Sequence, residues 1–249
     1  MSSGMYSLAL RPEARPTRLS LGVRLTGDAD VTSPPSTRSD EAPTTPLLER
    51  DEQPRNEPVH VITVGHGLLD ASLFASLLRG AGVGSLVDVR TAPGSRRNPA
   101  FGRAEMERWL PLEGIAYRWE PRLGGFRRPA ADTPNLALRH EGFRGYADHM
   151  QTSEFAEAID DLMRDAGTER RAAPSGDRGL LTTVMCSESV WWRCHRRLIA
   201  DNLVLSRQVE VRHLMHDGRL VVHALTDGVR LGDDGLLVYD GGAPPLPGT

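Results

Sequence analysis

The sequence of 249 residues contains no lysine, and all 30 of its basic residues are arginine. Without lysine the chain cannot form a Schiff base with a carbonyl substrate, and it lacks the lysine that a P-loop uses to hold phosphate. Lysine-dependent pyridoxal enzymes, Schiff-base aldolases and P-loop ATPases with their usual lysine are therefore excluded.

Cysteine and long apolar runs are also scarce. Cys186 and Cys194 are the two cysteines, which is too few for a disulfide scaffold and indicates a reduced environment. No run approaches the roughly 18 apolar residues of a membrane span. The N-terminus lacks the charged start and apolar core of a signal peptide. We therefore expect a cytoplasmic protein that does not bind membranes.

Aromatic residues make up only 5% of the chain, and Tyr6 is the one aromatic residue among the first 58. Residues 1–57 are rich in proline, serine, threonine, arginine and acids, and such a segment buries too little apolar surface to offset the cost of ordering. A wrongly chosen start codon is an alternative explanation for part of it. The predicted organisation is a disordered tail at 1–57, an α/β domain at 58–216, a β-extension at 217–240 and a flexible end at 241–249.

Strand and helix patterns alternate along the predicted domain. Helices are expected at 70–78, 103–110, 142–150, 153–166 and 193–203, and strands at 59–65, 85–90, 115–119, 179–186 and 209–214. Leu69, Leu73, Phe74 and Leu77 form the expected buried stripe of the first helix. Strands joined through helices require crossover connections, so we predict a mainly parallel sheet with helices on both faces, a Rossmann-like three-layer α/β fold. Residues 219–225 and 236–239 are expected to add a small β-segment, with a hairpin turn at 232–235.

Side chains capable of chemistry follow the predicted strands at their C-terminal ends. Ligands of open α/β sheets bind beyond this edge. His66 follows the first strand, Asp88 and Arg90 end the second, and Cys186 ends the fourth. This convergence predicts a functional site at the edge.

The same residues carry a resemblance to a known family. The runs Thr63–His66, Val87–Arg90 with Pro93 and Pro99, Leu123–Gly125, Tyr146–Ala147 before Met150, Cys186–Glu188 and Cys194–Arg196 occur in this order. In the presence and order of these motifs, the chain resembles the family of domain of unknown function 488, over about residues 58–216. It departs from the family at Gly67, where a hydroxyl residue is expected.

The resemblance implies an α/β domain with a shared pocket, and it implies no particular reaction. Combined with the strand-end pattern, it gives two sets of site residues. The predicted catalytic residues are His66, Cys186, Glu188 and His195. The predicted residues for binding an anionic substrate are Asp88, Arg90, Ser95, Arg96, Gly124, Gly125, Tyr146, Cys194 and Arg196.

The two thiols have several interpretations. Cys186 is either an inert core thiol or a reactive one, because a helix N-terminus and nearby arginines lower a thiol pKa. Cys194 lies within the following helix and is the weaker candidate. Together with His195 and His66 the thiols have the ligand types of a zinc site. No recognised ligand spacing is present, so no metal or other cofactor is predicted.

Arginine is concentrated between residues 90 and 128, where nine arginines face four glutamates. Guanidinium groups bind phosphate and carboxylate in bidentate fashion. The sequence therefore predicts an enzyme for an anionic substrate, either phosphorylated or derived from nucleic acid, and a hydrolase or transferase that uses a thiol or histidine. The alternative is a non-catalytic nucleic-acid-binding or regulatory module, in which Trp191 or Trp192 stacks on bases.

Overall fold

The computed structural model describes residues 60–94, 98–171 and 180–242. The chain divides into two units, Met1–Glu52 and Gln53–Thr249, and every described residue belongs to the second. The predicted tail at 1–57 and most of the predicted flexible end lie outside the described residues.

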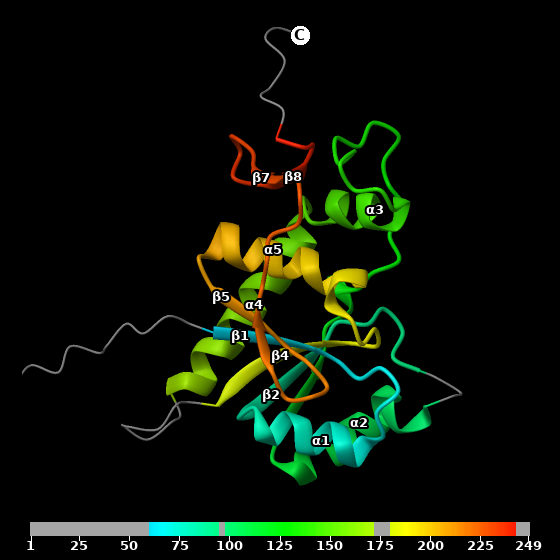
Figure 1. The fold of residues 1–249 in the computed structure, drawn as a ribbon, viewed down its shortest axis with the longest axis vertical. Coiled ribbons are helices and arrows are strands. Elements are labelled where there is room, and N and C mark those ends of the chain that lie inside the picture. Colours follow the sequence, from blue (N-terminus) through cyan, green and yellow to red (C-terminus); the bar gives the residue numbers. More distant parts are fainter. Residues whose placement is uncertain (1–59, 95–97, 172–179, 243–249) are drawn as a thin grey trace, which may run out of the picture. The chain divides into compact units, whose positions relative to one another are not determined.

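The central element is a six-stranded sheet with the strand order β3-β2-β4-β1-β5-β6 (Figure 1). Strands β1 to β5 pair in parallel, and β6 is antiparallel to β5. This confirms the predicted mainly parallel sheet. The strands are β1 His60–Gly65, β2 Val83–Asp88, β3 Ala116–Trp119, β4 Leu181–Cys186, β5 Glu210–Leu214 and β6 Leu220–Val222.

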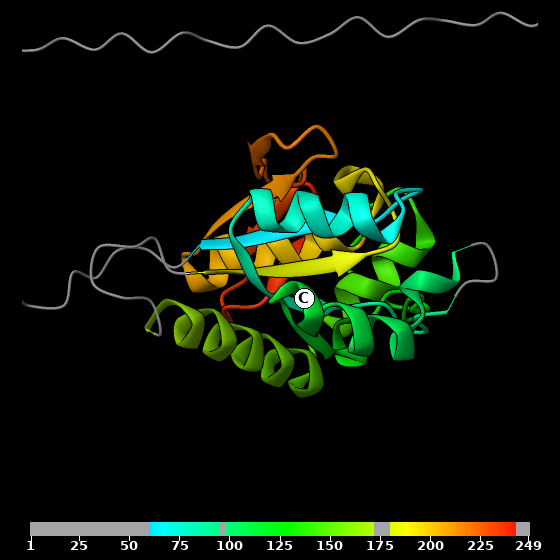
Figure 2. The ribbon, with the colours of Figure 1, turned by 90° about the horizontal axis from the view of Figure 1, so that it is seen from below.

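Helices cover both faces of the sheet, as predicted for a three-layer fold (Figures 1 and 2). Helices α1 (Ala71–Gly80) and α2 (Arg103–Trp109) cover one face, and α3 (Glu141–His149), α4 (Ser153–Arg171) and α5 (Arg196–Arg207) lie on the other side. Short 3-10 helices precede several of these elements: η1 Pro99–Phe101, η2 Pro111–Glu113, η3 Pro121–Leu123 and η4 Trp191–Arg193. Within the described ranges, none of the helices has the length and apolar character needed to cross a lipid bilayer.

Alternation along the strands produces two apolar cores. Val61 and Val184 point toward α4 and α5, whereas Ile62 and Val64 point toward α1 and α2. Because successive strand side chains face opposite sides of a sheet, each strand contributes to both cores. A residue at the end of a strand therefore lies with the helices of whichever face its side chain points to, either α1 and α2 or α4 and α5.

Asp70 is the N-cap residue of helix α1. Its carboxylate accepts a hydrogen bond of 2.8 Å from the Leu73 amide. Such a cap satisfies one of the unpaired amides of the first turn. Phe74 and Leu78 are fully buried, but Leu73 is 56% exposed. The predicted buried stripe was therefore wrong at Leu73, because the helix face that meets the sheet is centred on Phe74 and Leu78.

The C-terminal segment contributes to the same core as α4 and α5. Strands β7 (Val229–Leu231) and β8 (Leu237–Tyr239) form a separate antiparallel pair, joined through the predicted turn at 232–235. Sequence patterns missed β7. Tyr239 is fully buried, and its hydroxyl donates a 3.0 Å hydrogen bond to the buried carboxylate of Asp201 on α5. The hairpin thereby closes over α5 (Figure 1).

We expect Tyr239→Phe to lower the free energy of unfolding by about 1–3 kcal/mol, because Asp201 loses a donor inside the core. Urea denaturation measures this difference. Leu231→Ala, an exposed change in the same hairpin, should stay within about 0.5 kcal/mol of the parent and serves as the control. Equal stability of Tyr239→Phe and the parent would contradict the role of this hydrogen bond.

Candidate functional site

Two thiols and an imidazole meet where β4 ends and α5 begins. Cys186 is the last residue of β4, Cys194 follows η4, and His195 is the N-cap residue of α5. The Nδ1 atom of His195 lies 4.0 Å from the Cys186 sulfur and 3.7 Å from the Cys194 sulfur. We call these three residues the thiol–imidazole centre.

The ring of His195 is held from three sides. Its Nε2 lies 3.3 Å from the carbonyl oxygen of Val89, and its ring centroid is 5.1 Å from that of Tyr146. The Tyr146 hydroxyl in turn donates to the Leu123 carbonyl at 2.9 Å. A β-carbon added at Gly125 would lie 3.1 Å from His195 Nδ1. Tyr146 and Gly125, predicted to bind an anion, thus pack against the imidazole.

Gly124 also permits a close approach. A β-carbon at this position would lie 2.6 Å from the Thr91 hydroxyl oxygen, which is closer than van der Waals contact allows. The loop after η3 therefore needs glycine in order to lie against the segment after β2. The Thr91 hydroxyl donates a 2.9 Å hydrogen bond to the Gly125 carbonyl and fixes this contact.

The two thiols of the centre have opposite electrostatic environments. Burial raises the pKa of Cys194, but a hydrogen bond from Cys186 and the charge of Arg196 outweigh this effect and lower the pKa below its usual value. The hydrogen bond to Cys194, together with burial, raises the pKa of Cys186. Sequence analysis favoured Cys186 as the activated thiol. The balance of these effects instead favours Cys194 as the more acidic thiol.

Arg196 explains this assignment. Its side chain is only 1% exposed, its Nε donates to the Cys194 sulfur at 3.4 Å, and its Nη2 donates to the Glu188 carbonyl. Among the described residues, no carboxylate pairs with Arg196. A buried guanidinium is stabilised by a nearby negative charge, so the position of Arg196 beside the Cys194 sulfur favours the thiolate form of Cys194.

With metal-free, reduced protein, we expect iodoacetamide to modify Cys194 before Cys186, with an apparent pKa for Cys194 below that of a free thiol. Mass spectrometry of peptides over a pH series gives both rates. The control is Arg193→Met, which changes an exposed neighbour and should leave the order unchanged. Faster labelling of Cys186 would show that the thiolate resides there.

His66 lies on the other face of the sheet. Its ring stacks on Phe101 with centroids 4.2 Å apart, and Phe101 belongs to the core of α1 and α2. Cys186 belongs to the opposite core. The register pairs Gly65 with Cys186, so alternation sends His66, one residue later, to the far side. The common pocket of His66 and Cys186 expected from the sequence is therefore not formed.

Asp88 and Arg90 form a buried ion pair beside His66. The Arg90 Nε and Nη2 atoms lie 2.8 and 2.5 Å from the two Asp88 oxygens, and Arg90 Nη1 lies 3.4 Å from His66 Nε2. The Asp88 carboxylate also accepts from the Tyr117 hydroxyl at 2.8 Å. Burial and the charge of Arg90 lower the pKa of His66 to about 4. The charge of Arg90 is thus neutralised within the protein.

Among the described residues, Glu188 is the remaining predicted catalytic residue. Glu188 is exposed, and its carboxylate contacts the Val190 amide at 3.5 Å rather than a histidine. Ser95 and Arg96 lie outside the described residues. The arginine excess at 90–128 is largely paired with acids, some from elements that a local count misses, as seen for Arg90, Arg103, Arg108, Arg118 and Arg122.

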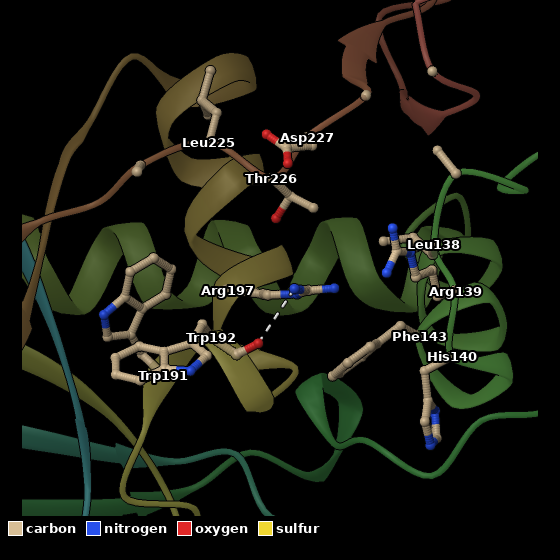
Figure 3. Close-up of a pocket in the computed structure, with 14 residues that line it drawn as sticks. Leu138, Arg139, His140, Phe143, Trp191, Trp192, Arg197, Leu225, Thr226 and Asp227 are labelled. Atoms are coloured by element: carbon tan, nitrogen blue, oxygen red, sulfur yellow. Dashed lines mark hydrogen bonds between the residues drawn. The ribbon is translucent and has the colours of Figure 1, made fainter.

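A cavity of about 820 Å³ opens beside the centre, between η4, α5, the segment before α3 and the loop after β6 (Figure 3). Arg197 runs across it, with Phe143 on one side and the tryptophans of η4 on the other. The Arg197 guanidinium lies 4.5 Å from the Phe143 ring centre. The lining residues are Ala137, Leu138, Arg139, His140, Phe143, Trp191, Trp192, Arg197, Ala224, Leu225, Thr226, Asp227, Gly228 and Gly241.

Sequence analysis also missed a buried hydrogen-bonded chain behind this cavity. The His213 imidazole bonds to the Thr63 hydroxyl at 2.6 Å and to His223 at 3.0 Å, and His223 bonds to Asp201 at 2.9 Å. Trp191 stacks on His213 with centroids 4.1 Å apart. In the predicted fifth strand, His213 follows Val211 by two residues and therefore faces the same side of the sheet. This spacing was the signal in the sequence that His213 is buried.

The fold and the site together define a three-layer α/β domain with a thiol–imidazole centre at the C-terminal edge of its parallel strands. The family model described as domain of unknown function DUF488 matches residues 70–203, and the chain belongs to this family. The matched region contains the whole centre and Arg197, whereas His66 and the C-terminal hairpin lie outside it. Neither the curated proteins nor the solved structures contain a match to the chain.

Proposed function

We propose that the protein is an enzyme that acts on an anionic substrate about the size of a mononucleotide, bound in the cavity of Figure 3. The observation that carries this proposal is the incomplete hydrogen bonding of the Arg197 side chain. Its guanidinium lies in the cavity, and its Nε is buried without a hydrogen-bond partner among the described residues. Nη1 donates to the Trp192 carbonyl at 3.2 Å.

An anionic ligand would satisfy this guanidinium. A buried donor without a partner costs free energy, and phosphate or carboxylate oxygens match the fork of an arginine. Arg139 and His140 line the same cavity, and Asp227 is its one acidic lining residue. Positive charge therefore exceeds negative charge around the space.

Aromatic side chains of the cavity suit a ligand that also carries a ring. Trp192 is 47% exposed, and Phe143 faces Arg197. Stacking on such side chains contributes about 1–3 kcal/mol per base. Trp191 is already stacked on His213, so of the two tryptophans considered from the sequence, Trp192 is the candidate for stacking.

The thiol–imidazole centre would supply the chemistry, because it shares its supporting elements with the cavity. Phe143 lines the cavity from α3, and Tyr146, one turn later, packs against His195. Arg197 follows His195 by two residues on α5. A histidine held in this way can accept or donate a proton. The reaction class that fits is hydrolysis or group transfer.

Titration with adenosine monophosphate, followed by tryptophan fluorescence, tests the proposal. We expect saturation at one site and weaker binding of adenosine, which lacks the phosphate. Arg197→Met should weaken binding about 10- to 100-fold, the effect of losing hydrogen bonds from a charged donor. Arg193→Met, an exposed arginine outside the cavity, is the matched control. Absence of binding of this nucleotide and of inorganic phosphate to folded protein would contradict the proposal.

The second candidate is a non-catalytic module that binds nucleic acid. It is favoured by one observation, namely that neither thiol of the centre nor His195 lines the cavity. For this function we expect short RNA or DNA to bind with an affinity that falls steeply as salt rises, because phosphate contacts release counterions. Mononucleotides would then bind poorly. The two titrations separate the candidates.

A further inference from the structure

We infer that Cys186, Cys194 and His195 form a binding site for a divalent transition metal ion, with Zn²⁺ as the ion that fits best. The inference goes beyond the proposed function and does not depend on it; with the ion bound, His195 would serve as a ligand and not as the group that transfers a proton. It rests on geometry: the two sulfur atoms and His195 Nδ1 all lie within 4.8 Å of one another.

The separations match a tetrahedral site after small movements. Zinc binds sulfur at about 2.3 Å and imidazole nitrogen at about 2.0–2.1 Å, so neighbouring ligand atoms in a tetrahedron lie about 3.6–3.8 Å apart. In the structure Nδ1 lies 3.7 Å from the Cys194 sulfur and 4.0 Å from the Cys186 sulfur. To hold an ion, the two separations between Nδ1 and sulfur would need shifts of only a few tenths of an ångström, and the two sulfurs lie within 4.8 Å of each other.

The surroundings are those of a metal site as well. The Nε2 atom of His195 lies 3.3 Å from the Val89 carbonyl, and a metal-bound histidine commonly donates its other ring nitrogen to such an acceptor. This contact places the proton on Nε2 and leaves the lone pair of Nδ1 facing the sulfurs. Arg196 Nε donates to the Cys194 sulfur, which orients that ligand from outside.

The three ligands come from two rigid elements. Cys186 ends the buried strand β4, and the other two residues open α5, whose first turns are packed in the core by Leu198 and Ile199. Three protein ligands leave a fourth position for water or substrate, as in catalytic zinc sites. Both thiols must lose their protons when the ion binds, so binding releases protons and strengthens as pH rises.

Cobalt titration of the full, reduced and chelator-treated protein tests the inference. We expect one Co²⁺ per chain, with intense visible bands of tetrahedral cobalt, a near-ultraviolet sulfur-to-cobalt charge-transfer band, and displacement of both by Zn²⁺. Cys186→Ser and Cys194→Ser should each lose more affinity than the roughly 10- to 100-fold that removal of an outer-shell partner costs. His60→Asn is the control and should bind as the parent does, because His60 is a partly exposed residue at the start of β1, at the opposite end of that strand from the edge that holds the centre.

If a cysteine variant does not fold, measurements on the parent protein still test the inference. In the parent protein, Zn²⁺ should protect both cysteines from iodoacetamide, and X-ray absorption of the zinc-loaded protein should show two sulfur ligands and one imidazole. Folded protein without the cobalt bands, bands that persist in Cys194→Ser, or a zinc shell without sulfur would each overturn the inference. None of these metal-binding measurements uses nucleotide. A negative result would therefore overturn the metal site and leave the proposed anion binding in the cavity to its own test.

Discussion

Replacing Asp88 with asparagine is expected to lower the free energy of unfolding by about 3–5 kcal/mol, because it leaves a buried arginine without its counter-charge. Asp88 is fully buried, and Arg90 is 7% exposed. In the parent, the carboxylate accepts two bonds from the guanidinium, one from the Arg90 amide and one from the Tyr117 hydroxyl. Urea denaturation at neutral pH gives the difference.

A surface pair provides the matched control. Arg103 and Glu107 lie 2.7 Å apart on α2, with side chains 48% and 46% exposed, and Glu107→Gln should cost less than about 1 kcal/mol. The double variant Asp88→Leu with Arg90→Leu removes both charges and should recover part of the loss. If Asp88→Asn is as mild as Glu107→Gln, the ion pair does not stabilise the α1–α2 side of the sheet.

Acidification is expected to destabilise the protein through its buried histidines. Burial, followed by the charges of His223 and Arg196, lowers the pKa of His213 to about 3. An unfolded histidine titrates near pH 6.5, so between these values the unfolded chain binds a proton that the folded chain does not. Stability is unaffected by this group above about pH 6.5 and falls below it. At pH 5 the loss from His213 is about 2 kcal/mol relative to pH 7.

His66, with its pKa lowered to about 4, should add a loss of similar size over the same interval. Urea denaturation at pH 7 and pH 5 measures the sum. In His213→Asn the difference between the two pH values should shrink by about 2 kcal/mol. Leu231→Ala, an exposed change that removes no titratable group, should leave the difference as in the parent. An unchanged difference in His213→Asn would show that this imidazole is protonated in the folded state.

The two faces of the sheet divide the predicted site residues into a first part and a second part. Asp88, Arg90 and His66 are bound to one another and to the α1–α2 core. The thiol–imidazole centre lies against α3 and α5, beside the cavity that contains Arg197 (Figure 3). Proton transfer and metal or anion binding are proposed for the second part.

The order of apolar and polar residues was sufficient to predict the layers. A strand pattern ending at Gly65, another ending at Cys186, and helical spacing between them predicted a mainly parallel three-layer sheet, which the structure confirms. The sequence also predicted that Cys186, Cys194 and His195 lie at one edge of the sheet with His66 and Glu188, since Cys186 ends a strand and Cys194 and His195 open the next helix. These features depend on residues that are close in sequence or on a repeating period.

Pairing between distant segments was decided by tertiary structure alone. The register of β1 against β4 placed His66 and Cys186 on opposite faces, and a slip of one residue would have put them together. The partner of Arg90 is two residues away, but the partners of Arg118 and Arg122 include acids on α4. A count of charges between residues 90 and 128 therefore overstated the number of unpaired arginines. Arg196 donates to the Cys194 sulfur, and its charge lowers the pKa of Cys194 rather than that of Cys186. The sequence alone determined which groups reach the sheet edge. Register, side-chain direction and long-range ion pairing decided which of them meet.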